Sequence, residues 1–351
     1  MRVLYFTKYT RKGASSRLRS LQYLPILEKN SIHVQVQPLF NDAYLDDLYN
    51  GKRTSLILLL KAYFTRFIFL FKVFNYDKII IEKELFPFFF SWFERLFKLM
   101  GIKYIVDYDD AIFHNYDLNS NKVIAFLLGR KIDNVMKFSN CVLAGNDYLA
   151  ERARKAGAKN IVSLPTVIDL KRYEIKTDYS SSQIVIGWIG SPSTLWHLKP
   201  FPEVFNELVE TYNVKIVIIG ATEEFGIRKN IEYLPWTEDS EVEEILKFDI
   251  GIMPLTNTPW VLGKCAYKLI QYMGCAIPVV ASPVGMNSQV VGHQVDGFLA
   301  TTPQEWKAAL EKLILDQNLR ENFGKAGREK VEAIYNLEVN SKKIIEVLQK
   351  Y

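Results

Sequence analysis

Short apolar segments alternate with longer amphipathic segments along the whole chain. In the first half, the predicted strands are Arg2–Phe6, His33–Gln37, Lys78–Ile81, Lys103–Val106 and Cys141–Leu143. In the second half, they are Gln183–Ile189, Val214–Ile219, Ile231–Leu234, Asp249–Met253 and Ile277–Val280. Such alternation is typical of βαβ units and a parallel sheet. We therefore predict an α/β protein with one doubly wound parallel sheet in each half.

The length of the chain and one polar stretch predict how these halves are divided. The chain has 351 residues, which is more than a domain with a single hydrophobic core usually contains. The polar, serine-rich stretch after residue 168 interrupts the alternation. We expect a Rossmann-like domain at 1–168, a linker at 169–182 and a second Rossmann-like domain at 183–335. The amphipathic segment 336–351 is predicted to be a helix that packs back on the first domain.

Composition narrows the class of protein. Apolar residues make up 49% and charged residues 24%, as in a globular protein. The three cysteines have no metal-ligand spacing, which indicates a reducing compartment and no zinc site. The N-terminus lacks the pattern of a signal peptide, so we expect a cytoplasmic protein. The net charge is a modest +5, and a nucleic-acid partner would need a broader basic face and a recognised binding module, neither of which the sequence shows.

One stretch, residues 56–99, combines aromatic and aliphatic side chains with scattered cations. Lys61, Arg66 and Lys72 interrupt its first apolar block, which argues against a membrane-spanning helix. Two interpretations remain open. The stretch is either a surface helix at a lipid headgroup layer, at the inner face of the membrane, or a buried helix whose cations extend to solvent.

Residues 249–285 carry the strongest chemical pattern. A predicted buried strand ends at Pro254, and Gly263 is expected to open a helix that carries Lys264, Lys268 and Gln271. A glycine-opened helix N-terminus offers free N–H groups to a diphosphate, and Lys264 adds a positive charge there. Gln271 lies two turns further on, where its amide could bind a ribose hydroxyl.

This stretch resembles the donor-binding segment of the family 4 (group 1) retaining glycosyltransferases of GT-B fold. The likeness extends to the glycine loop at residues 13–17, which follows the first predicted strand, and to the IGWIGSPST segment at residues 186–194. It implies two Rossmann-like domains that face each other across a cleft. It also implies transfer from a nucleotide-diphosphate sugar, without a metal or other cofactor. Where the family usually has two glutamates, this chain has Gly263 and Gln271, so the resemblance leaves the donor sugar open.

The resemblance also assigns roles to two turns that follow predicted strands. In the second domain the turn Gly190, Ser191, Ser193 and Thr194 lacks the family's usual arginine, and Lys199 stands near its usual lysine. Small hydroxyls and free amides in this turn still suit a phosphate, although Ser191 or Ser193 could instead cap the next helix. In the first domain, the donor-binding loop is expected at Gly13, Ser15, Ser16 and Arg17.

Carboxylates and a tryptophan complete the candidate site. Asp107, Asp109 and Asp110 end the fourth predicted strand, where clustered negative charge is costly unless it has a partner or a function. The resemblance places Asp109 near the transferred sugar, so Asp107, Asp109 and Lys264 are the expected catalytic residues. Trp236 follows a strand in the region that holds the base, and it either contacts the base or belongs to the core.

The predicted function is transfer of a sugar to a hydroxyl of a glycan or lipid-linked acceptor in cell-surface polysaccharide or glycoconjugate synthesis. The resemblance implies retention of configuration. No side chain indicates a covalent intermediate, so catalysis would rest on positioning and on charge stabilisation. Two alternatives stay open. The three aspartates would suit a GT-B-like sugar-nucleotide epimerase, and the missing glutamate pair would suit a non-catalytic nucleotide-sugar-binding subunit.

Overall fold

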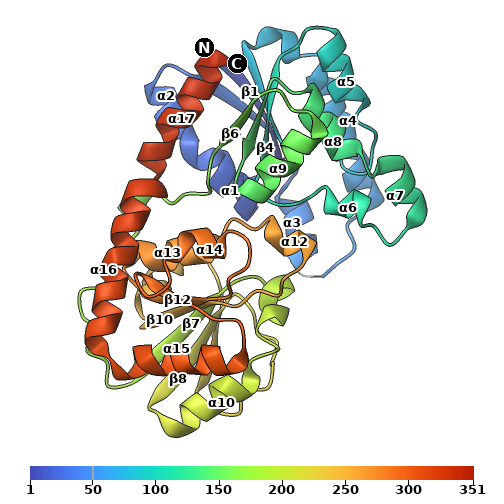
Figure 1. Ribbon diagram of the computed structural model, residues 1–351. Helices are drawn as coiled ribbons and strands as arrows, with labels where there is room; N and C mark the ends of the chain where they lie inside the picture. The colour runs from blue at the N-terminus through green and yellow to red at the C-terminus, as the bar shows by residue number, and fades with distance from the viewer. Residues whose placement is uncertain (50) are drawn as a thin grey trace. The chain divides into compact units, whose positions relative to one another are not determined.

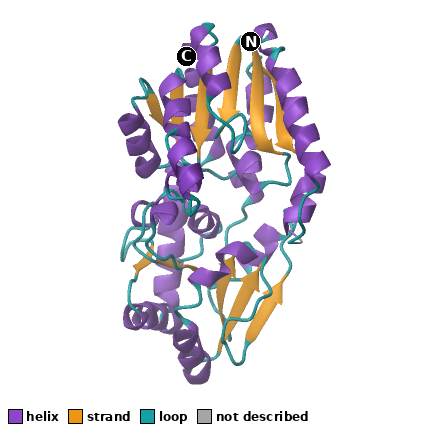
Figure 2. Ribbon diagram, turned by 90° about the vertical axis from the view of Figure 1, so that its right-hand side faces the viewer, coloured by secondary structure: helices purple, strands orange, loops and turns teal. Residues whose placement is uncertain are grey.

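The computed structural model describes residues 1–49 and 51–351, and they divide into two compact units. Unit 1 consists of Met1–Thr166, Gly263–Cys265 and Glu338–Tyr351, and unit 2 consists of Val167–Leu262 and Ala266–Leu337. Each unit has one six-stranded parallel sheet with helices on both faces (Figures 1 and 2). The predicted class, two doubly wound α/β domains, is confirmed.

In unit 1 the strand order is β2-β1-β3-β4-β5-β6. The strands are β1 (Arg2–Tyr9), β2 (His33–Phe40), β3 (Lys78–Glu82), β4 (Tyr104–Tyr108), β5 (Cys141–Ala144) and β6 (Ile161–Ser163). The helices are α1 (Ala14–Arg19), α2 (Leu24–Lys29), α3 (Asp42–Tyr49), α4 (Leu56–Leu70), α5 (Trp92–Leu99), α6 (His114–Asp117), α7 (Lys122–Leu128), α8 (Lys131–Phe138), α9 (Asp147–Ala156) and α17 (Leu337–Lys350). The strand order reverses direction between β1 and β3, which makes that gap the topological switch point.

In unit 2 the strand order is β12-β11-β10-β7-β8-β9. The strands are β7 (Ile184–Ile189), β8 (Val214–Ile219), β9 (Ile231–Leu234), β10 (Ile250–Met253), β11 (Val279–Ala281) and β12 (Gly297–Leu299). The helices are α10 (Pro202–Thr211), α11 (Glu241–Leu246), α12 (Pro259–Leu262), α13 (Tyr267–Gly274), α14 (Asn287–Val290), α15 (Pro303–Leu315) and α16 (Gln317–Ile334). This is the Rossmann order, with its switch point between β7 and β10.

Both sheets are built from strands whose apolar runs are continuous rather than alternating. Val3–Phe6 of β1 is fully buried, and Ile79–Ile81 of β3 is nearly so. Parallel strands covered by helices on both faces require such runs. The sequence missed β6 and β12. Each is only three residues long and lies at the edge of its sheet, so neither carries a long apolar run.

The polar stretch 169–182 belongs to unit 2 and is bound along it. Its two tyrosines, Tyr173 and Tyr179, are buried, and the Tyr179 hydroxyl donates to the carbonyl of Ala276 at 2.8 Å. The Lys176 amine lies 2.9 Å from the Asp249 carboxylate. Two buried aromatic side chains and an ion pair thus hold a segment whose polar composition predicts only a linker.

Candidate active site

Two places in the molecule have the geometry of a ligand site in a doubly wound sheet. Ligands of such sheets bind beyond the carboxyl ends of the strands, at the switch point. In unit 1 this is the end of β1 and β3, next to helix α1. In unit 2 it is the end of β7 and β10, next to helix α13. Most of the residues that the sequence predicts for the site lie at one of these two places.

In unit 1, the two serines of the glycine loop bind carboxylates from β3 and from the end of β4. The Ser15 hydroxyl lies 2.6 Å from Asp109 and 3.1 Å from Glu82. The Ser16 hydroxyl donates to Glu82 at 2.6 Å, and the Lys8 backbone N–H donates to the same carboxylate at 3.0 Å. The loop is therefore tied to the sheet by side-chain hydrogen bonds. Burial raises the pKa of Glu82.

Lys83, the residue after β3, neutralises this cluster. Its amine lies 2.9 Å from the Asp109 carboxylate and donates to the Ser15 hydroxyl at 2.8 Å. Its backbone φ is 67°, an unfavourable conformation for a lysine that is retained mainly where the surroundings enforce it, often at functional sites. Burial opposes the charge on Lys83, but the carboxylates of Asp109 and Glu82 outweigh burial and raise the pKa of the lysine.

Asp109 is held as a fixed anion by this arrangement. Burial works against its ionisation, but Lys83, Arg19 and the hydrogen bond from Ser15 lower the pKa of Asp109 to about 2. A carboxylate with that pKa is a poor proton donor or acceptor at neutral pH, because a general acid or base works best near the ambient pH. Asp109 can instead accept hydrogen bonds from a ligand hydroxyl or stabilise positive charge.

Asp107 has a different environment from its neighbour. Two guanidinium nitrogens of Arg19 bind its two carboxylate oxygens, and both side chains are 1% exposed. Arg19 also donates to the carbonyl of Leu164 at 2.7 Å. This buried pair joins helix α1 to β4 and to the end of β6. Its geometry favours a structural role for Asp107, since neither oxygen is open to a ligand.

The other two glycine-loop candidates shape the loop. Gly13 precedes α1, and a Cβ there would lie 2.4 Å from the Tyr9 Cβ, so a side chain would not fit. Arg17 is buried, and its guanidinium donates to the carbonyl of Arg11 at 3.3 Å. The side chain predicted to meet an anionic partner thus also spans the turn between β1 and α1.

The structure around Lys264 shows that the helix predicted to begin at Gly263 does not begin there. Gly263 does not open a helix that carries Lys264. Helix α12 ends at Leu262 and α13 begins at Tyr267, after Ala266 with a left-handed φ of 53°. A Cβ on Gly263 would lie 2.4 Å from the Ala111 nitrogen, so this close approach admits only glycine. Periodicity missed the break because the residues on either side of it are helical.

Lys264 itself lies next to the third aspartate of the cluster. Its amine is 3.2 Å from the Asp110 carboxylate, and its backbone carbonyl accepts a hydrogen bond from the Asn146 amide at 3.0 Å. Residues 263–265 belong to unit 1, so these contacts are internal to that unit. Both members of the pair are partly exposed, at 30% and 24%, which leaves the Lys264 amine accessible to a ligand.

In unit 2 the turn after β7 is covered by a lysine. A Cβ on Gly190 would lie 2.7 Å from the Lys268 amine and 2.6 Å from the Trp188 ring. Lys268 extends from α13, with its amine 4.3 Å from the centre of the Trp188 ring and 3.5 Å from the Thr194 hydroxyl. The glycine thus lets a cation approach the turn, as an anion site requires.

The serines of this turn are not engaged as helix caps. Ser191 precedes the short 3₁₀ helix Pro192–His197, but its side chain makes no capping bond. Its hydroxyl instead pairs with the Ser193 hydroxyl at 2.9 Å, at an exposed position. Both hydroxyls therefore face solvent at the carboxyl end of β7. Of the two interpretations of this turn, capping is the one that the side-chain geometry does not support.

Trp236 lies close to the same turn. A Cβ on Gly220, which has a φ of 86°, would lie 2.6 Å from the Gly190 carbonyl and 3.1 Å from the Trp236 Cβ. Trp236 is 36% exposed, and its indole N–H donates to the buried carboxylate of Glu241 at 3.0 Å. The ring is thus oriented by Glu241 and keeps an accessible face.

Lys199 and Gln271 have other partners. Lys199 forms an exposed ion pair with Glu223 at 2.9 Å. Gln271 is buried, and its amide donates to the Tyr173 hydroxyl at 3.0 Å. In the structure, Gln271 therefore connects α13 to the 169–182 segment.

Two residues of the unit 1 cluster, Glu82 and Lys83, were missed by the sequence analysis. The signal was present, because charged residues directly follow the apolar run of β3 at its carboxyl end. Within residues 1–49 and 51–351, no group of three His, Cys, Asp or Glu side chains could hold a metal ion. The three clustered aspartates are instead each paired with a cation, Asp107 with Arg19, Asp109 with Lys83 and Asp110 with Lys264.

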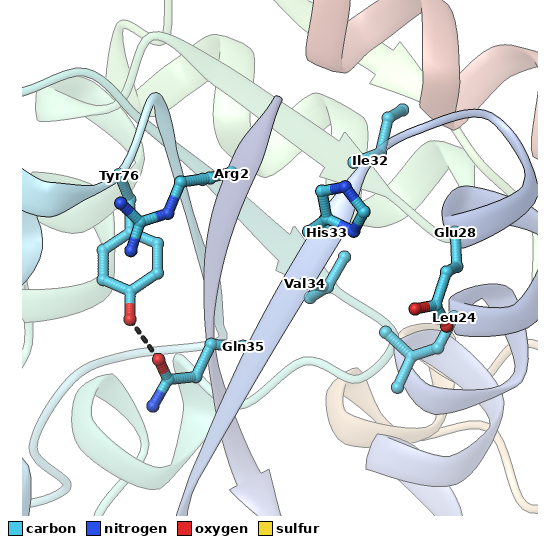
Figure 3. Close-up of a pocket in the computed structure, with 8 residues that line it drawn as sticks. All are labelled: Arg2, Leu24, Glu28, Ile32, His33, Val34, Gln35 and Tyr76. Atoms are coloured by element: carbon cyan, nitrogen blue, oxygen red, sulfur yellow. Dashed lines mark hydrogen bonds between the residues drawn. The ribbon is translucent and has the colours of Figure 1, made fainter.

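A cavity of about 330 Å³ lies elsewhere in unit 1, at the amino ends of β1 and β2 (Figure 3). Arg2, Glu28, His33 and Tyr76 are among its lining residues, and the Tyr76 hydroxyl donates to the Gln35 amide oxygen. The candidate site lies at the carboxyl ends of the strands, whereas this cavity lies at their amino ends. The cavity is therefore separate from the candidate site.

Most of the second half of the chain matches a known family of proteins. Residues 190–330 match the sequence model of the family described as glycosyl transferases group 1. Over this segment the chain is similar to the group 1 glycosyltransferases. It contains the Gly190 turn, Trp236 and helix α13. No curated protein matches the sequence.

Solved structures of glycosyltransferase fold resemble the whole chain. A sucrose-phosphate synthase from Thermosynechococcus elongatus has a TM-score of 0.73 at 13% identity, and the alignment covers 100% of this chain and 98% of that one. HepE (Alr3699) from Anabaena, in complex with UDP-glucose, has a TM-score of 0.70 at 16% identity, with 100% of both chains covered. WaaG, a glycosyltransferase of lipopolysaccharide biosynthesis, has a TM-score of 0.67 at 14% identity, again with 100% of both chains covered. At this identity the likeness shows the fold, which is GT-B.

Proposed function

We propose that this glycosyltransferase transfers a sugar, with retention, from a nucleotide-diphosphate donor to a hydroxyl of a glycan or lipid-linked acceptor. The observation that carries the proposal is the Gly190 turn, with the Lys268 amine over it and two exposed serine hydroxyls beside it. Supporting it, the turn lies within the matched segment, and one protein of the same fold was solved with UDP-glucose.

In this proposal the diphosphate binds to unit 2. The backbone amides and hydroxyls of Ser191 and Ser193 contact its oxygens, and Lys268 neutralises them. The base lies against the exposed face of Trp236. This residue is close to the donor turn because Gly190 and Trp236 both pack against Gly220. Lysine charge neutralises the diphosphate, so the reaction as proposed uses no metal ion or other cofactor.

Catalysis in this proposal depends on fixed charges. As the bond between the sugar and the diphosphate breaks, negative charge grows on the leaving phosphate and positive charge grows on the sugar ring. Lysine amines stabilise the first, and a permanently ionised carboxylate such as Asp109 suits the second or a sugar hydroxyl. Asp109 would stabilise the positive charge on the sugar ring without transferring a proton, which agrees with its low pKa.

Two of the three aspartates are poorly suited to the epimerase alternative. An epimerase needs a side chain that exchanges protons with the sugar at neutral pH. Asp109, with a pKa of about 2, does not meet that need, and Asp107 is bound on both oxygens by Arg19. A non-catalytic binding subunit would bind the donor without turnover, so activity measurements separate it from an enzyme.

The test begins with donor binding. Thermal shift is measured with UDP-, GDP- and dTDP-sugars on the wild-type chain and on Lys268→Met, with Lys325→Met as the control. Lys325 is an exposed lysine of α16 that pairs with Glu321. We expect one donor class to stabilise the wild type and the control but not Lys268→Met. Unchanged stabilisation of Lys268→Met, or none of the wild type by any donor, would contradict the donor site.

The second step identifies the product. The donor that binds is incubated with candidate acceptors, and the products are separated and their anomeric configuration determined by NMR. Transfer with retention supports the proposal, whereas an epimerised donor or binding without turnover supports one of the two alternatives.

A further inference from the structure

Helices α4 and α5 of unit 1 expose an unusual amount of apolar surface. Eight large side chains on or next to these helices are between 60% and 78% exposed: Leu56, Ile57, Leu60, Phe64, Phe71, Phe74, Trp92 and Leu99. Large exposed apolar patches commonly mark an interaction site, because such surface is costly in water. We call the outer face of residues 56–74 and 88–100 the basic aromatic face.

Ring contacts connect the two helices across this face. Phe67 of α4 packs edge to face against Phe93 of α5, with ring centres 5.9 Å apart, and against Phe71, at 5.3 Å. Trp92 stacks on Phe90 at 4.9 Å and contacts Phe89 at 5.5 Å. Phe89 contacts Phe93 as well, at 6.1 Å, so the rings of the two helices form one connected group.

The inner side of α4 is fixed by a buried arginine. Arg66 is fully buried, and its guanidinium donates to the carbonyls of Thr7 and Gln37, at the ends of β1 and β2. It also lies over the ring of Phe6, 4.9 Å from its centre. The packing contradicts the interpretation of α4 as a buried helix: α4 lies on the sheet with one edge buried, and most of its apolar side chains face outward.

The charges around the face are of one sign. Residues 48–76 contain no aspartate or glutamate, and Lys52, Arg53, Lys61 and Lys72 are exposed. Between 85 and 103 the single acidic residue, Glu94, is buried, whereas Arg95, Lys98 and Lys103 are exposed. Such a face complements a layer that is anionic at its surface and apolar beneath it, as anionic lipids are.

Neither self-association nor membrane spanning fits as well. A second copy packed on this face would bring lysines and arginines opposite one another with no exposed acid to pair with them. A spanning helix needs about 20 apolar residues, whereas the whole of α4 is 15 residues long. Among the helices of the described ranges, 1–49 and 51–351, none is long and apolar enough to cross a bilayer.

We propose that the basic aromatic face binds the surface of an anionic lipid bilayer, with its aromatic side chains in the headgroup layer and its cations on lipid phosphates. The face is continuous with the loop that carries the unit 1 cluster. Phe88 is five residues beyond Lys83, and the Tyr63 hydroxyl of α4 donates to the carbonyl of Pro87 at 2.7 Å. If the proposed glycosyl transfer holds, the bilayer would present a lipid-linked acceptor beside this loop; binding to the bilayer itself does not depend on the reaction.

The experiment measures co-sedimentation of the full chain with vesicles of phosphatidylcholine alone and with 30% phosphatidylglycerol. We expect binding to the anionic vesicles that weakens as salt is raised, because salt screens the charges. Each cation near an anionic surface contributes roughly a fivefold increase in binding. The triple variant Lys61→Gln, Lys72→Gln and Lys98→Gln should therefore bind roughly 100-fold more weakly, while Lys307→Gln with Lys325→Gln, exposed lysines of unit 2, should bind as the wild type does.

A second pair of variants tests the apolar contribution. Phe64→Ser with Phe71→Ser should lose vesicle binding, whereas Leu315→Ser with Val295→Ser, exposed apolar positions of unit 2, should retain it. Circular dichroism and donor-induced thermal shift confirm that each variant is folded, and they report separately on the proposed donor site. Absence of wild-type binding to anionic vesicles, equal binding of both variant pairs, or dimerisation in solution that the Phe64/Phe71 variant abolishes would each overturn the proposal.

Discussion

Replacement of Lys83 by methionine tests the electrostatics of the unit 1 cluster directly. Methionine keeps much of the length of the side chain but removes its charge. The Lys83 amine lies 2.9 Å from Asp109, and the two side chains are only 5% and 14% exposed. Removal of the lysine leaves the buried Asp109 carboxylate without its nearest cation, and breaking a buried pair in this way typically costs about 3–5 kcal/mol in the free energy of unfolding. We expect Lys83→Met to lose that amount at pH 7.

Lys199→Met is a matched control for this variant. Lys199 forms an ion pair with Glu223 at the same distance, 2.9 Å, but its members are 52% and 58% exposed. Exposed pairs of this kind contribute about 0–1 kcal/mol, because water screens them. The substitution and the distance are the same in both cases, so the difference between the two variants measures the effect of burial.

The pH dependence gives an independent check with a definite sign. The pKa of Asp109 is about 2, below its ordinary value of 3.8. A depressed acid stabilises the fold above its ordinary pKa, and that stabilisation is lost as pH falls toward 2. The difference corresponds to about 2 kcal/mol. Without Lys83 the pKa of Asp109 should rise, so the stability deficit of Lys83→Met should shrink between pH 7 and pH 3.

Urea unfolding followed by circular dichroism at pH 7, 5 and 3 measures these deficits. Hydrogen exchange of peptides from β3 and β4 assigns the loss to unit 1. A deficit of Lys83→Met below 1 kcal/mol at pH 7, equal to that of the control, would refute the reasoning. A deficit that grows on acidification would refute it as well, because it would mean that Lys83 does not hold Asp109 ionised.

Three further predictions concern single residues. Lys264→Ala should lower turnover at least tenfold, about 1.4 kcal/mol, if its amine meets charge in the reaction; wild-type rates in a steady-state assay would remove it from the mechanism. Gly190→Ala should raise the KM for the donor, because the added Cβ would meet the Lys268 amine and the Trp188 ring; an unchanged KM would contradict the donor turn. Arg66→Met should destabilise the chain by about 3 kcal/mol or more, because buried carbonyls lose their donors; urea unfolding with wild-type stability would contradict this.

The positions of the candidate site residues show what tertiary structure added to the sequence. Ser15 and Asp109 are separated by 94 residues and lie 2.6 Å apart because both follow strands of one parallel sheet. The sequence analysis predicted both as site residues, since Ser15 lies in the glycine loop after the first predicted strand and Asp109 lies beyond the end of the fourth. It missed Glu82 and Lys83, because a charged pair after an apolar strand looks like any polar loop until its partners are known.

The prediction that a helix begins at Gly263 was wrong for a related reason. Local pattern does not reveal that Ala266 takes a left-handed conformation or that the backbone of Ala111 approaches Gly263. Both depend on contacts between residues far apart in the chain. The same holds for residues 169–182, whose composition predicts a linker but whose tyrosines are buried on unit 2.

The sequence by itself determined the alternation of strands and helices, because fully buried parallel strands require continuous apolar runs that are visible without coordinates. It also located the glycine turns at the ends of β1 and β7. Only the tertiary structure decided which charges meet: Asp107 with Arg19, Asp109 with Lys83, and Asp110 with Lys264. The reason is physical. Hydrophobic periodicity is local, whereas the ionisation of a buried carboxylate depends on the distance to cations brought near it by the fold.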